Sequence, residues 1–63
     1  MMTKSKWRRI EDQVAAGKVV EFEDEGEWFY VFRMGGLYLL QTEEGETLKR
    51  FKTLREMRYY MTA

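Results

Sequence analysis

Three short glycine-containing segments divide the middle of this chain, and their spacing constrains the fold more than any other feature. Asp24-Glu25-Gly26 and Glu43-Glu44-Gly45 each end in glycine, and Gly35-Gly36 lies between them. Glycine readily adopts the left-handed backbone conformations that tight hairpin turns require. The intervening segments are short and rich in β-branched and aromatic residues, which favour strands. The sequence therefore predicts a four-stranded antiparallel meander over residues 18–23, 28–34, 37–42 and 47–51.

A helix is predicted before the first strand, over residues 5–17. Its apolar residues recur at helical spacing and form one narrow stripe. The glycine at position 17 suits a helix end, because a left-handed residue is favoured there. Either Thr3 or Ser5 supplies the N-cap, and the sequence does not choose between them. The stripe consists of Trp7, Ile10 and Val14.

A second helix is predicted to close the chain after the last strand. Thr53 and Glu56 have the spacing of a capping box, in which each side chain accepts from a backbone N–H of the first turn. The apolar residues that follow at helical spacing are Leu54, Met57, Tyr60 and Met61. The predicted fold is a single α+β domain over residues 1–63, with the order α-β-β-β-β-α.

The composition excludes several classes of function. The 63 residues contain 11 basic and 11 acidic side chains, and no His, Cys or Pro. Disulfide bonds, cysteine-based zinc sites and His-assisted nucleophiles are therefore ruled out. We expect no enzyme activity, no cofactor and no bound metal. The longest apolar run falls far short of the ~20 residues that a membrane helix needs, so we expect a cytoplasmic protein with no membrane partner.

The turns also predict which residues share a face of the sheet. A three-residue turn over Asp24-Glu25-Gly26 pairs Glu23 with Glu27 and fixes the alternation of the strands. The first face then carries Val20, Phe22, Trp28, Tyr30, Phe32, Met34, Leu37, Leu39 and Phe51. The second face carries Val19, Phe29, Val31, Tyr38, Leu40 and Leu48.

We expect both helices to cover the first face, which is the richer in apolar residues. The second face would then be an open apolar surface suited to a protein partner or to a second copy of the chain. Two alternatives remain open. One helix could cover each face, or a two-residue Glu25-Gly26 turn could shift the first strand by one residue and exchange its two faces.

The charges are segregated along the chain although they sum to zero. The first and third turns of a meander lie at the same end of the sheet, so their carboxylates are predicted to form one acidic edge. This acidic edge consists of Asp24, Glu25, Glu27, Glu43, Glu44 and Glu46. The helices carry the basic side chains Lys4, Lys6, Arg8, Arg9, Arg55 and Arg58.

These surfaces predict a small non-enzymatic protein-binding module. Its apolar sheet face would contact the partner, and the acidic edge would orient a basic partner surface. By size alone the chain is comparable to phage and prophage proteins that inhibit or adapt host proteins. The alternative is a nucleic-acid-binding regulator that uses the basic helices, although zero net charge and the acidic edge disfavour nucleic acid. The predicted protein-binding residues are Val19, Phe29, Val31, Tyr38, Leu40, Leu48 and the six residues of the acidic edge.

Overall fold

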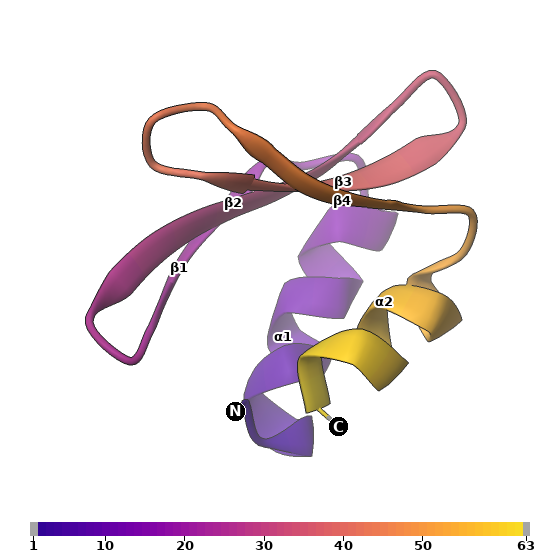
Figure 1. Cartoon of the computed structure of the whole chain (residues 1–63). Helices are drawn as coiled ribbons and strands as arrows, with labels where there is room; N and C mark the ends of the chain where they lie inside the picture. The colour runs from indigo at the N-terminus through magenta and orange to yellow at the C-terminus, as the bar shows by residue number, and fades with distance from the viewer. Residues whose placement is uncertain (1, 63) are drawn as a thin grey trace.

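The computed structural model describes residues 2–62, which form one sheet with both helices on the same side (Figure 1). The strands pair in the order β1-β2-β3-β4, and each pairing is antiparallel. The predicted α+β order α-β-β-β-β-α is therefore confirmed. The elements are α1 (Lys4–Ala15), β1 (Val20–Asp24), β2 (Glu27–Met34), β3 (Leu37–Thr42), β4 (Thr47–Phe51) and α2 (Leu54–Thr62).

Helix α1 is capped at both ends. The Thr3 hydroxyl accepts a hydrogen bond from the Lys6 backbone N–H at 3.3 Å, so Thr3 rather than Ser5 is the N-cap. At the other end Gly17 has a φ of 86°. Its N–H donates to a carbonyl of the last helical turn, and so does the N–H of the residue after it. This pair of bonds is the Schellman ending that a glycine at this position predicts.

Helix α2 begins at the predicted capping sequence. The Thr53 hydroxyl accepts from the Glu56 backbone N–H at 3.1 Å. The Glu56 carboxylate accepts in turn from the Lys52 N–H at 3.3 Å, one residue before the position that the capping box assigns to it. Two side chains thus satisfy backbone donors at the start of a helix too short to be stable alone.

The second and third turns match the prediction. Gly35 and Gly36 have φ values of 59° and 80°, and Met34 pairs with Leu37 across this two-residue turn. In the third turn the Thr42 N–H donates to the Glu46 carbonyl at 2.9 Å, as expected for a three-residue connection. The Gly35-Gly36 turn places Val31 opposite Leu40 on the central strands, as the sequence predicts.

The first turn is the two-residue turn that the sequence left open as an alternative to the three-residue turn. Asp24, not Glu23, pairs with Glu27, so the turn contains only Glu25 and Gly26, with φ values of 53° and 81°. A glutamate in this left-handed region is unusual, because its Cβ crowds the following carbonyl. The missing residue shifts β1 by one position. The assignment of Val20 and Phe22 to the first face was therefore wrong, because they lie opposite Val31 and Phe29 on the second face.

The helices cover the second face, and the expectation that this face is open was wrong. Val31 is fully buried and Leu40 is 2% exposed, in one core with Trp7, Val14 and Met57. Phe29, Tyr38 and Phe51 belong to the same side, so Phe51 also changes face. The one-residue shift of β1 explains why the helices cover the second face and not the first. It moves Glu21 and Glu23 to the first face, where a covering helix would have buried their carboxylates.

Val19 and Leu48 also depart from the predicted second face. Val19 precedes β1 and is exposed. Leu48 is the extra residue of a β-bulge, because Leu40 pairs with Lys49 whereas Gln41 pairs with Thr47. Bulged residues leave the regular alternation of a strand. Neither side chain is therefore part of the buried core, and both are exposed to solvent.

The burial of one sheet face predicts opposite outcomes for two lysine substitutions on β2. Val31→Lys places a charge in the core and should unfold the domain, because the cost of several kcal/mol is comparable to its whole stability. Trp28→Lys, the control on the other face of the same strand, should remain folded. Circular dichroism during thermal unfolding measures both. A folded Val31→Lys variant would show that the helices do not cover this face.

Candidate functional site

The sheet face away from the helices, called the outer face below, presents an apolar stripe along β2. The stripe comprises Trp28, Tyr30, Phe32 and Met34, at alternate positions of an eight-residue strand. Trp28 is 42% exposed and Met34 57% exposed. Both helices lie on the opposite side of the sheet (Figure 1), so no helix among residues 2–62 covers the stripe. Large apolar side chains in solvent are typical of interaction surfaces.

The stripe is supported by its neighbours on β3. Phe32 pairs with Leu39, and Leu39 pairs with Arg50 on β4. Leu39 is buried although it lies on the face away from the helices. Leu37 pairs with Met34 and extends the apolar area by one row. The outer face thus carries apolar residues on both of its central strands.

Carboxylates border the stripe on β1. Glu21 pairs with Tyr30, and Glu23 pairs with Trp28. A hydrogen bond with the Glu21 side chain, and then the negative charge of Glu21, raise the pKa of the Tyr30 phenol. Glu43 contributes a smaller repulsion of the same sign. The negative charge on β1 therefore affects the titration of Tyr30, a member of the aromatic stripe.

The first and third turns lie at the same end of the sheet, as the meander predicts. Residues of both turns line one small hollow of about 220 Å³. Glu27, Glu43 and Glu44 are thereby brought together, with Trp28 among them. Glu25 and Glu46 are exposed in the same two turns. No group of three or more carboxylates within residues 2–62 converges as it would around a metal ion.

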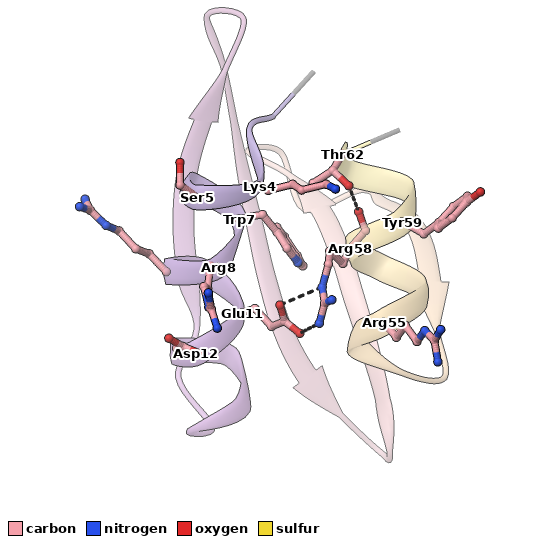
Figure 2. A pocket seen from close by; sticks show the side chains of 11 residues that line it. Lys4, Ser5, Trp7, Arg8, Glu11, Asp12, Arg55, Arg58, Tyr59 and Thr62 are labelled. Carbon is pink, nitrogen blue, oxygen red and sulfur yellow. Dashed lines mark hydrogen bonds and ion pairs between the residues drawn. The ribbon is translucent and has the colours of Figure 1, made fainter.

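A groove separates the two helices on the other side of the molecule (Figure 2). Its volume is about 1030 Å³, and cations from both helices line it. The Arg58 guanidinium donates to both carboxylate oxygens of Glu11, at 3.1 and 2.7 Å, and so connects the helices. This pair raises the pKa of Arg58. The cations of this interhelical groove are Lys4, Arg8, Arg9, Arg55 and Arg58.

Trp7 lies between the helices beside this ion pair (Figure 2). Its ring is fully buried, and its indole N–H has no acceptor among the side chains and backbone of residues 2–62. Sequence analysis placed Trp7 in the core stripe but gave no sign of the Glu11–Arg58 pair, whose members are 47 residues apart. No local pattern predicts a contact over that separation.

Comparisons with protein-family models, curated proteins and solved structures give no match for this chain. No helix within residues 2–62 is both long enough and apolar enough to cross a membrane. The functional argument therefore rests on the outer face, the acidic edge and the interhelical groove.

The Glu21–Tyr30 contact predicts a measurable titration. Glu21→Gln should lower the pKa of Tyr30 towards its ordinary value, because it weakens the hydrogen bond that holds the phenol protonated and removes the negative charge that opposes phenolate formation. Since the native pKa is raised, the contact stabilises the fold at pH values below the ordinary tyrosine pKa. This contribution is lost as the pH rises through the native pKa.

Tyrosine ring carbon shifts, followed by NMR as the pH is raised, measure this titration. Glu23→Gln is the matched control on the same strand and should leave the Tyr30 pKa unchanged. An equal effect of both substitutions would contradict a specific Glu21 contact.

Proposed function

We propose that this protein is a small non-enzymatic protein-binding module whose partner covers the outer face of the sheet. The single observation that carries the proposal is the stripe of Trp28, Tyr30, Phe32 and Met34 on the face away from the helices, exposed at its two ends and half-buried in its middle. Aromatic residues and methionine are enriched where proteins contact one another, and tryptophan and tyrosine often dominate the binding energy. The stripe replaces the second face as the proposed contact surface, because Val31 and Leu40 are buried.

The acidic edge defines the chemistry of the partner more closely. Glu27, Glu43 and Glu44 line one hollow with Trp28, at one end of the stripe. A partner surface with an apolar centre and basic side chains on one border is complementary to this arrangement. Carboxylates at such a border speed association and fix orientation more than they add affinity. An inhibitor or adaptor, of the kind that small phage and prophage proteins provide, fits this size and surface.

A non-enzymatic role is favoured by the setting of the carboxylates. Glu21 and Glu23 are exposed on the edge strand β1 beside aromatic rings, and neither lines the interhelical groove or the hollow between the turns. Acid–base catalysis relies on carboxyl groups whose pKa values are adjusted by burial or by close neighbours in a cleft. The outer face offers a surface for contact instead.

The interhelical groove supports a second candidate, the binding of a nucleic-acid backbone. Five cations line it, and Tyr59, which also lines it, is 80% exposed and available for stacking on a base. Glu11 and Asp12 lie among these cations and reduce the positive charge. A backbone binder loses affinity steeply as salt rises, with a logarithmic slope near −0.9 for each phosphate contacted. A protein binder that uses the outer face should bind no duplex at any salt concentration.

Two matched substitutions test the outer face against the helices. Trp28→Glu should weaken binding to a partner purified from the source cells about 30-fold, the loss that corresponds to a hot spot of ~2 kcal/mol. Tyr59→Glu alters an exposed aromatic on α2 and should leave that binding unchanged. Titration calorimetry against the purified partner measures both. If Tyr59→Glu loses partner binding and Trp28→Glu does not, the binding site lies on the helices and not on the outer face.

A further inference from the structure

We propose that the interhelical groove binds a terminal phosphate group, of a phosphomonoester or of inorganic phosphate, which takes the place of the Glu11 carboxylate on Arg58. This site lies on the helices and is independent of the protein-binding role of the outer face. A terminal phosphate has at least three oxygens free of ester bonds and carries about two negative charges near neutral pH. The groove matches these properties with surplus cations, a guanidinium fork and an unused hydrogen-bond donor.

Each helix contributes one complete stripe of side chains to the groove. The members of both stripes follow the spacing i, i+3, i+4 and i+7, which places side chains on a single face of a helix. Two such faces form the walls of the groove (Figure 2). The stripe of α1 is Lys4, Trp7, Arg8 and Glu11, and the stripe of α2 is Arg55, Arg58, Tyr59 and Thr62.

Positive charge is in excess along this groove, although the charges of the whole chain sum to zero. Five cations and two acids line it, which leaves a formal surplus of three positive charges. Four of these cations form no hydrogen bond or ion pair with residues 2–62. An anion with two negative charges gains more from such a surplus than a single carboxylate does. The four cations are Lys4, Arg8, Arg9 and Arg55.

The contact between Glu11 and Arg58 shows how the groove holds an oxyanion. Nε and Nη2 of Arg58 donate to the two carboxylate oxygens at 3.1 and 2.7 Å, which is the paired geometry in which guanidinium groups also bind phosphate. The Arg58 side chain is half exposed. Ion pairs open to solvent contribute little to stability. A more highly charged oxyanion in the groove therefore competes with Glu11 for the same guanidinium.

The indole N–H of Trp7 distinguishes a phosphate from a carboxylate at this position. Trp7 lies one turn before Glu11 on α1, and its ring extends towards Arg58 on α2 (Figure 2). Its nitrogen is buried and makes no hydrogen bond within residues 2–62, which is uncommon for a buried polar group. Both oxygens of Glu11 are bound to Arg58. A phosphate that displaces this carboxylate offers two oxygens to Arg58 and a third to the indole N–H.

The number of free oxygens also selects the chemical class of the ligand. A phosphodiester, as in a nucleic-acid backbone, has only two free oxygens and one negative charge. It therefore offers no more than the carboxylate that it would have to displace. A terminal phosphate offers one more acceptor and one more charge. Lys4 and Arg8 lie on the same helical face as Glu11, so their charges add to that of Arg58.

Titration with small phosphates, followed by NMR of the side-chain N–H signals, tests the site. Inorganic phosphate and phenyl phosphate are the two probes, used at constant ionic strength. The Trp7 indole proton should move downfield and saturate, because it gains a charged acceptor. The indole proton of Trp28, on the outer face, is the internal control and should not move. A response to phenyl phosphate alone assigns the site to monoesters, and a response to both probes assigns it to any terminal phosphate; either result supports the inference.

Two substitutions test the exchange at Arg58. Glu11→Gln should tighten phosphate binding ~10-fold, because a neutral amide competes less well for the guanidinium. Arg58→Lys keeps the charge but removes the fork, and should weaken binding ~10-fold. Arg50→Lys, an exposed arginine on β4 away from the groove, is the matched control and should leave binding unchanged. Circular dichroism verifies that each variant is folded.

Three results would overturn the inference. The first is a Trp7 signal that responds to neither phosphate probe, and the second is weaker phosphate binding by Glu11→Gln. The third is an equal shift with dimethyl phosphate, a diester, which would assign the groove to nucleic-acid backbones instead. None of these results affects the role of the outer face, which the Trp28→Glu variant tests separately.

Discussion

The length of the first turn determines which face of the sheet can be buried, and the rest of the structure depends on that choice. With two residues in the turn, Val20 and Phe22 join Val31 on one face, while Glu21 and Glu23 join the other. Burial of an unpaired carboxylate costs far more than a small domain can supply. The helices can therefore cover only the face that is free of acids at its centre.

Two short helices then leave the other face in solvent. Helices α1 and α2, of 12 and 9 residues, both pack on the same side of the sheet (Figure 1). Among residues 2–62 no third helix lies over the other face to build a third layer. The largest aromatic residues of β2 consequently remain on the outside. The stripe on the outer face thus follows from the placement of both helices on one side of the sheet.

Local signals predicted most of the fold, and the errors arose where a tertiary effect prevailed. Glycine pairs, helix caps and strand composition are local, so the element order and the turn at Gly35-Gly36 were predicted correctly. The length of the first turn could not be predicted from local signals. A left-handed Glu25 is unfavourable by itself and is accepted only because burial of Phe22 stabilises the shifted strand. The acidic edge followed from the alternating directions of a meander. Which face stays open did not follow from local signals, because a shift of one residue exchanges the two faces of β1.

The register of β1 against β2 is the most direct test of this account. In the two-residue register, Glu23 and Trp28 form the non-hydrogen-bonded pair next to the turn, where opposite Cα atoms approach to about 4.5 Å. A nuclear Overhauser spectrum should therefore show strong contacts between the Hα atoms of Glu23 and Trp28, and of Glu21 and Tyr30. A strong Hα contact between Phe22 and Trp28 would instead indicate the three-residue turn. That result would return Glu21 and Glu23 to the face of Val31 and contradict the assignment of the buried and outer faces.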